Sequence, residues 1–212
     1  PWTFHDVSGN GEERDNGGSV CNRDEAAAVV AMVSALRGRG VDIGRTRSLR
    51  VLTFYSAQVR CVCRALEAAG LREDVMVGTV DGAQGAESDV VILSFVRSNN
   101  NVPLHQALEP AETERTHTRV AAFLTLDPLC CCQASIGFVE DWRRLNVAIT
   151  RAKHALIMIG SARTLGSGEA GEAASDLIRA AASANAIWSY TEQRTAETVS
   201  YTHLTLPTST TV

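Results

Sequence analysis

Two short, almost wholly apolar runs constrain the fold of this chain more than any other feature. Residues 89–95 read DVVILSF, and residues 154–160 read HALIMIG. Such runs are typical of strands that are buried on both faces of a parallel sheet. Parallel strands need crossover connections, which are usually helices, so the two runs predict an α/β fold with a mainly parallel sheet covered by helices.

The segments around these runs continue the alternation of strands and helices. Further strands are predicted at residues 2–7, 48–55 and 75–80. Helices are predicted where apolar residues recur at helical spacing and a glycine follows, at residues 24–40 and 57–69. Asn22 or Asp24 is the expected N-cap of the first helix, which puts Arg23 beside a helix N-terminus.

A third helix, predicted for residues 137–153, combines a core face with a basic face. Its apolar stripe has spacings of three and four and consists of Trp142, Leu145, Ile149 and Ala152. Arg144 and Arg151 are seven residues apart and therefore share another face. Paired guanidinium groups favour an anionic partner such as phosphate. The alternative is an ordinary solvated basic face.

Composition limits the classes of function. With 212 residues, of which 45% are hydrophobic, the chain is long enough for one globular domain with a core. Its net charge of −4 shows no overall excess of basic residues, so a contact with nucleic acid would be confined to a local surface. The six cysteines form no CxxC pair, so we expect reduced thiols and no metal site. No apolar run reaches membrane-spanning length, and we expect a cytoplasmic or nuclear protein without a membrane partner.

Two segments do not fit the α/β pattern. We expect a domain over residues 1–190 that is interrupted by an irregular insertion at 99–135, which has no apolar period. Residues 191–212 carry no helix pattern and include SYTHLTLPT, which is similar to translated sequencing-adapter sequence. We expect this tail to be disordered or artefactual. Pro1 stands where an initiator methionine is expected, which favours a fragment of a longer protein.

Four ordered segments carry a resemblance to a known family. TVDGAQGAESDVVILSFVRSN and IGFVEDWRRLNVAITRAK resemble motifs V and VI of superfamily 1 helicases, and VLTFYSAQV resembles motif IV. SVCNRDEA resembles the segment that opens the second RecA-like domain in the branch of the nonsense-mediated-decay helicase, the senataxin-like helicases and a group of nuclease-helicases. The resemblance implies a RecA-like fold that represents the second motor domain only, since no GxxxxGK[ST] loop is present.

The resemblance also implies roles for individual residues. Arg151 matches the motif VI arginine finger, Arg23 matches a second γ-phosphate-sensing arginine, and Arg144 shares the basic face. The nucleotide contacts that the resemblance implies fall on Gln84, Gly85, Glu87 and Tyr55. Thr53 and Thr79 match positions that touch the backbone of a bound single strand, although each is also an ordinary strand residue.

The implied function is that of an ATP-dependent RNA or DNA helicase. ATP with Mg²⁺ is the implied cofactor, and its metal ligands belong to the first RecA-like domain. The implied partners are single-stranded RNA or DNA and that N-terminal RecA-like domain of the same protein. The chain departs from the family pattern at Phe54, Ala83 and Ala86, where relatives carry Pro, Phe and Arg. The second interpretation is therefore a non-catalytic RecA-like module that docks a protein or a nucleic acid.

Overall fold

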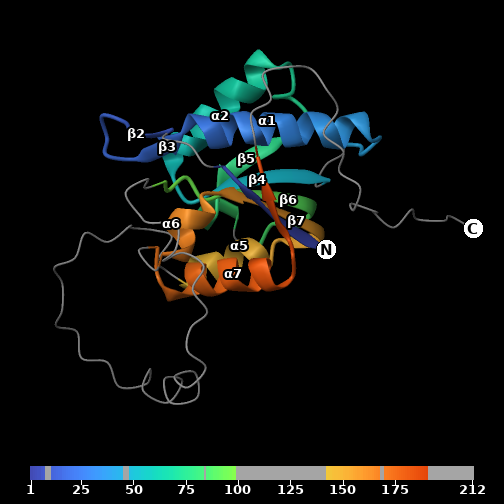
Figure 1. Cartoon of the computed structure of the whole chain (residues 1–212). Helices are drawn as coiled ribbons and strands as arrows, with labels where there is room; N and C mark the ends of the chain where they lie inside the picture. Colours follow the sequence, from blue (N-terminus) through green and yellow to red (C-terminus); the bar gives the residue numbers. More distant parts are fainter. Residues whose placement is uncertain (8–10, 45–47, 84, 99–141, 168–169, 191–212) are drawn as a thin grey trace, which may run out of the picture.

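A computed structural model describes residues 1–7, 11–44, 48–83, 85–98, 142–167 and 170–190. Its centre is a six-stranded sheet with the order β5-β4-β6-β7-β1-β8, in which every neighbouring pair is parallel (Figure 1). The prediction of an α/β fold with a mainly parallel sheet is confirmed. The sheet strands are β1 Trp2–Asp6, β4 Leu49–Thr53, β5 Met76–Thr79, β6 Ser88–Ser94, β7 Ala152–Gly160 and β8 Ile187–Ser189.

Helices cover both faces of the sheet (Figure 1). One face carries α1 (Arg23–Gly38) and α2 (Ser56–Ala68). The other face carries α5 (Trp142–Ile149) and α7 (Glu172–Ser183), with the short α6 (Ala162–Gly166) beside them.

Alternate residues of the two apolar runs divide between these layers. Val90 and Ile92 of β6 join the cluster under α1 and α2, whereas Val91 and Leu93 join the cluster under α5 and α7. All four side chains are at most 4% exposed. This explains why the run is apolar at every position: a strand between two helical layers buries both of its faces.

The first helix begins as predicted. Asn22 is its N-cap, and the Asn22 Oδ1 atom accepts a hydrogen bond from Glu25 N at 3.1 Å. Its expected alternative, Asp24, lies inside the first turn.

The prediction for residues 137–153 is wrong at its C-terminal end. The helix ends at Ile149, Thr150 and Arg151 form a turn, and Ala152 already belongs to β7, where it pairs with Ser88. The Thr150 hydroxyl donates to the carbonyl of Asn146, so it competes with the continuing helix. The apolar stripe is also wrong at Trp142, which is 49% exposed. Residues 137–141 lie outside the described residues.

Five further elements were not predicted. A two-stranded antiparallel hairpin, β2 (Glu12–Arg14) with β3 (Val20–Asn22), forms in the glycine-rich loop. Residues 161–190, for which no element was predicted, supply α6, α7 and β8. The predicted insertion at 99–135 and tail at 191–212 lie outside the described residues. In the part of the chain that is described, no helix is long and apolar enough to cross a membrane.

Candidate functional site

Arg151 occupies the turn between α5 and β7, at the amino end of the strand. Its Nε atom donates to the carbonyl of Val147 at 3.1 Å, and Nη2 donates to the Thr150 hydroxyl at 3.3 Å. Among the described residues, no carboxylate forms an ion pair with Arg151. The guanidinium group is therefore held by neutral oxygen atoms at the end of its own helix, and its charge is not neutralised by a described acid.

Arg144 has a different environment, although it lies on the same helix. Its Nη2 atom is 3.2 Å from Asp81 Oδ2, and the Arg144 side chain is 28% exposed. Asp81 begins the short helix η1 (Asp81–Ala83), which follows β5. The loop after β5 and the third helix therefore meet at these two residues.

The loop from Asp81 to Glu87 crosses the face of the sheet that carries α5. It leaves β5 at the carboxyl edge of the sheet and enters β6 at the amino edge, since Thr79 is in register with Thr53 and Ser88 pairs with Ala152. Ala83 is buried in the core cluster of that face. Gly85 has φ +78, and a Cβ added there would meet no atom within 4 Å, so this position faces open space.

Glu87 and Arg151 come together at the amino edge. The Ser88 N–H donates to the Arg151 carbonyl at 3.0 Å, which sets the loop beside the turn. The carboxylate of Glu87 is 3.6 Å from Lys153 Nζ, and both side chains are about half exposed. Gly85 and Glu87 are exposed and Arg151 is partly exposed, whereas Gln84 lies outside the described residues.

The remaining candidate residues lie at the carboxyl edge. Thr53 ends β4, and Thr79 ends β5. Thr53 is fully buried, which favours the interpretation as an ordinary strand residue, while Thr79 is half-buried and its hydroxyl accepts from Gly82 N at 3.2 Å. Tyr55 caps α2 at the same edge and is only 5% exposed; its burial raises its pKa.

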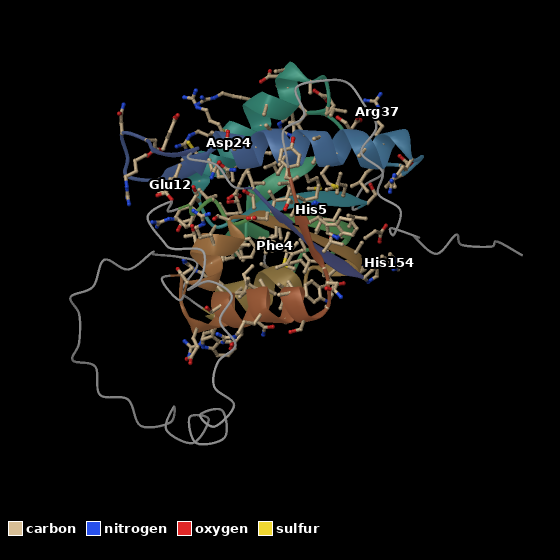
Figure 2. The ribbon with its side chains drawn as sticks, viewed as in Figure 1. Phe4, His5, Glu12, Asp24, Arg37 and His154 are labelled. Atoms are coloured by element: carbon tan, nitrogen blue, oxygen red, sulfur yellow. The ribbon has the colours of Figure 1, made fainter. Side chains whose placement is uncertain are left out.

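Arg23 also belongs to the carboxyl edge, so the structure does not bring it beside Arg151. It is the first residue of α1 and forms an exposed ion pair of 2.9 Å with Glu13. The seven residues of β6 separate the two edges by roughly 20 Å. Figure 2 shows the separation: Glu12 and Asp24 lie at one end of the molecule, and Arg37 and His154 lie at the other.

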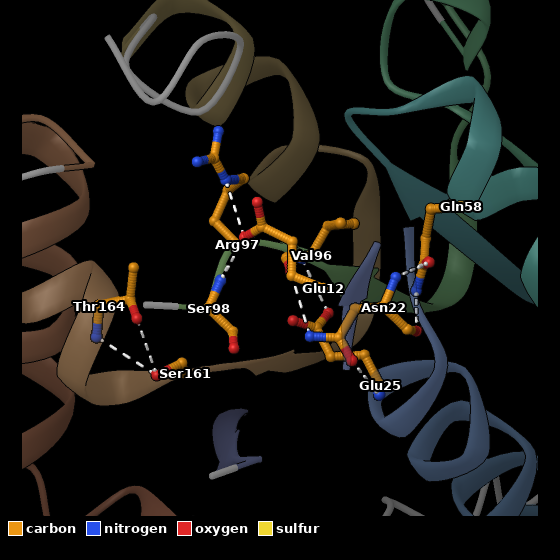
Figure 3. A network of polar contacts seen from close by, with 9 residues as sticks. All are labelled: Glu12, Asn22, Glu25, Gln58, Val96, Arg97, Ser98, Ser161 and Thr164. Atoms are coloured by element: carbon orange, nitrogen blue, oxygen red, sulfur yellow. Dashed lines mark hydrogen bonds and ion pairs between the residues drawn. The ribbon is translucent and has the colours of Figure 1, made fainter. Parts of the chain in front are cut away.

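Sequence reasoning missed a buried polar network that joins α1, α2 and β6 (Figure 3). Glu25 Oε2 accepts from Ser94 Oγ at 2.6 Å and from Val96 N at 2.9 Å. Gln58 Nε2 donates to Ser94 Oγ at 3.0 Å and to the carbonyl of Asn22 at 3.1 Å. The other carboxyl oxygen of Glu25, Oε1, is buried and has no hydrogen-bond partner among the described residues.

Burial raises the pKa of Glu25 to about 8, although the bonds from Ser94 and Val96 oppose the shift. A carboxyl group without a nearby cation keeps its proton in such a site. Glu25 is therefore neutral in the folded chain near pH 7. No sequence pattern indicates this protonation, because an acidic residue in the first turn of a helix is normally solvated and interacts with the helix dipole.

The network holds a segment with an unusual backbone. Val96 has φ +75, a conformation that β-branched residues rarely adopt. Its amide is bound by Glu25 and its carbonyl by Asn22 Nδ2 at 3.1 Å. Glu12 Oε2 then accepts from Arg97 Nε at 3.2 Å and from Ser98 N at 2.9 Å. These contacts fix the chain where it leaves β6.

The described residues contain no group of three or more histidine, cysteine, aspartate or glutamate side chains that could hold a metal ion. The amino-edge residues instead suit a phosphate group. Arg151 offers a guanidinium group without an acidic partner among the described residues, and Gly85 leaves space for close approach. A metal ion bound beside such a phosphate would need ligands from outside the described residues.

Comparisons with known proteins agree on one family. A protein-family model described as "AAA domain" matches residues 1–163. Regulator of nonsense transcripts 1 of Caenorhabditis elegans is 33% identical over 170 residues, which is 78% of this chain and 13% of that protein.

Two further relatives come from other organisms. An uncharacterized ATP-dependent helicase of Methanocaldococcus jannaschii is 32% identical over 165 residues, covering 78% of this chain and 18% of that protein. Probable helicase senataxin of Homo sapiens is 30% identical over 166 residues, covering 78% of this chain and 5% of that protein. The chain therefore spans less than a fifth of the length of each of these relatives.

Proposed function

Because the chain belongs to the superfamily 1 helicases, in the branch of the regulators of nonsense transcripts and the senataxins, we propose that it is the second motor domain of an ATP-dependent RNA or DNA helicase. The proposed chemistry takes place at the amino edge of the sheet. There the domain would close over ATP that is held by an N-terminal RecA-like domain of the same protein.

The observation that carries the proposal is the environment of Arg151. Two interpretations were open: an arginine finger, or a structural arginine paired with an acid. A structural ion pair needs a carboxylate partner, and none of the described ion pairs includes Arg151. Its Nε and Nη2 atoms bind Val147 O and Thr150 Oγ1, and these bonds orient the side chain. This favours the finger.

An oriented, unneutralised guanidinium group is what phosphoryl transfer requires. Negative charge spreads over the equatorial oxygen atoms of the γ-phosphoryl group in the transition state, and a fixed cation there increases turnover by about 10³ to 10⁵. Glu87, next to the same turn, would contact the ribose or a water molecule. A Mg²⁺ ion would be held by residues of the first domain and would supply positive charge at the phosphates. Delivery of Arg151 by domain closure would couple hydrolysis to motion.

A bound single strand would contact the opposite, carboxyl edge. Thr79 is the better of the two candidates there, because it is half-buried whereas Thr53 has no exposed surface. A hydroxyl group can contact a phosphate without reading the base sequence. The γ-phosphate role of Arg23 stays a prediction that this placement does not support, because Arg23 lies at the same carboxyl edge and is paired with Glu13.

The experiment compares two lengths of the protein. A longer protein that includes the first RecA-like domain should hydrolyse ATP, and a single-stranded RNA or DNA should stimulate the hydrolysis. The 212-residue chain alone should neither hydrolyse ATP nor bind it tightly, because the phosphate-binding loop and the metal ligands are on the first domain. Hydrolysis by the pure short chain, above that of a mock preparation, would contradict this division of labour.

The second candidate is a non-catalytic RecA-like module. The substitutions at Ala83 and Ala86 favour it, since they remove an aromatic and a basic side chain from motif V. It predicts that the longer protein binds a single strand or a protein partner but does not hydrolyse ATP under any condition.

A further inference from the structure

Two cysteine thiols meet at a place that the proposed motor function does not use. Cys21 lies on β3 and Cys61 lies on α2, and β3 packs along the first turns of that helix. Figure 1 shows the two elements side by side. Both cysteines are free and half-buried.

Hydrogen bonds fix the position of β3 on α2. Ala57 N donates to Ser19 Oγ at 3.1 Å, and Asn22 N donates to Gln58 Oε1 at 2.8 Å. Cys21 is located between these two anchored residues of the hairpin. Cys61 lies one helical turn after Ala57 and Gln58, so it belongs to the same face of the helix.

The two thiols interact directly. Burial raises the pKa of Cys61, and the neighbouring Cys21 thiol raises it further through its charge and a hydrogen bond. Arg23 and Arg64 lie close enough to lower the same pKa. These cations partly oppose the upward shift at Cys61, and neither thiol is fully buried, so both are accessible to a small oxidant.

We propose that Cys21 and Cys61 are a redox-modifiable pair that forms a reversible disulfide with a peroxide as oxidant. Peroxide oxidises one thiol to a sulfenic acid and is itself reduced, releasing one water molecule. The second thiol attacks the sulfenic sulfur, the S–S bond forms, and a second water molecule leaves. Two thiols and one hydrogen peroxide thus give one disulfide and two water molecules, and a dithiol reverses the step.

The bond would fasten the β2–β3 hairpin to α2. Cys21 is two residues before Arg23, and Glu13 of the same hairpin holds Arg23 in its ion pair. The disulfide would close a loop of about 40 residues in the unfolded chain, which should raise the melting temperature by about 5–10 °C. Oxidation would therefore stiffen the carboxyl edge.

The test uses the 212-residue chain with two thiols left in place. In the first variant, serine replaces Cys63 and Cys130 to Cys132, so Cys21 and Cys61 are the two remaining cysteines. The matched control keeps Cys21 and Cys63 and has Cys61→Ser instead, because Cys63 lies on the same helix two residues further on and faces away from Cys61. Each is treated with hydrogen peroxide, and intact mass and free thiols are followed over time.

The Cys21/Cys61 variant should lose 2 mass units and two free thiols as a monomer, at least about 10-fold faster than the control, and dithiothreitol should restore both. Equal rates in the two variants, sulfinic acid without a disulfide, or only disulfide-linked dimers would overturn the proposal. Should the serine substitutions prevent folding, peptide mapping of the unsubstituted chain decides. Residues 15–23 must then be linked to residues 61–64, with the link lost in Cys61→Ser and kept in Cys63→Ser.

Discussion

Arg144 of α5 is ion-paired with Asp81 of η1 at 3.2 Å, and this pair joins the motif VI helix to the loop that crosses the sheet beside it. Arg151, on the turn that follows the same helix, has no such partner among the described residues. Two arginines that sequence spacing places on one face therefore have different environments. Arg144 is ion-paired with the loop, whereas Arg151 binds only neutral oxygen atoms among the described residues.

The first prediction concerns that ion pair. Asp81→Asn should lower the free energy of unfolding by about 0.2–1 kcal/mol, because Asp81 is 60% exposed and water screens the pair. Urea denaturation at low and at high salt measures the effect, which should shrink at high salt. A double-mutant cycle with Arg144→Gln isolates the coupling. A coupling energy above about 2 kcal/mol would show that the pair is a principal support of the fold.

The second prediction concerns the buried carboxyl group of Glu25. Its pKa is about 8 in the folded chain and near 4.5 in the unfolded chain. Between pH 4.5 and pH 8 the Glu25 carboxyl group keeps its proton in the folded chain and loses it in the unfolded chain. The free energy of unfolding should therefore fall as the pH rises through this window, by at most about 1.4 kcal/mol per pH unit from this group.

Glu25→Gln should remove that slope, because an amide does not titrate. Denaturation of the parent chain and the variant at several pH values between 5 and 8.5 measures the difference, with exposed Glu67→Gln on α2 as the control. His5, whose pKa burial lowers to about 4, contributes a slope of opposite sign below pH 6.5 in both chains and cancels in the comparison. An unchanged slope in Glu25→Gln would mean that Glu25 is ionised in the fold.

The third prediction concerns Gly85. Its φ of +78 is a left-handed conformation, while the space around an added Cβ is empty. Gly85→Ala should therefore destabilise through backbone strain alone, by about 1 kcal/mol. The control is Gly78→Ala in β5, where a Cβ also meets nothing and φ is not positive, so stability should stay the same or increase. Equal shifts of the two denaturation midpoints would argue against the strain.

The sheet could be predicted from the sequence, but the end of the third helix could not. The runs in β6 and β7 are readable because burial on two faces leaves a local pattern. At Thr150 to Lys153 the local pattern favours a helix, yet pairing of Ala152 with Ser88 draws these residues into β7. Ser88 lies 64 residues before Ala152 in the sequence. The tertiary pairing therefore overrides the local helix preference that the spacing of the apolar residues indicates.

Departures from the family pattern were also hard to interpret from sequence alone. Ala83 removes the aromatic residue of motif V, which predicts a lost packing contact. In the structure Ala83 is 1% exposed and belongs to the same core cluster as Phe54, the other departure. Phe54 packs against Phe95 with ring centroids 5.8 Å apart. The two departures therefore share one core cluster, a grouping that is visible only in the three-dimensional structure.

The sequence predicted which residues are chemically suited to a site, but it did not predict how they are grouped. Arg151, Glu87 and Gly85 lie near the amino edge, whereas Arg23, Tyr55, Thr53 and Thr79 lie near the carboxyl edge. The buried network escaped notice because Glu25 and its partners Ser94 and Val96 are 69 and 71 residues apart. Each of these residues is ordinary in its local context.

The turnover of an Arg151 variant shows whether Arg151 acts as an arginine finger. In a protein that joins this chain to its first RecA-like domain, Arg151→Ala should lower ATP turnover by about two orders of magnitude or more. Nucleotide affinity should change much less, because the charge that Arg151 meets develops mainly in the transition state. Arg151→Lys should restore little, since a point charge does not replace the planar fork.

The melting temperature of the same variants separates the finger from a structural arginine. Arg151 binds only neutral oxygen atoms near the surface among the described residues, so Arg151→Ala should shift the melting temperature by no more than a few degrees. If Arg151 is an arginine finger, the Arg151→Ala protein folds with nearly normal stability but has lost its ATP turnover. A protein that melts at a clearly lower temperature yet keeps its turnover per folded molecule would contradict it.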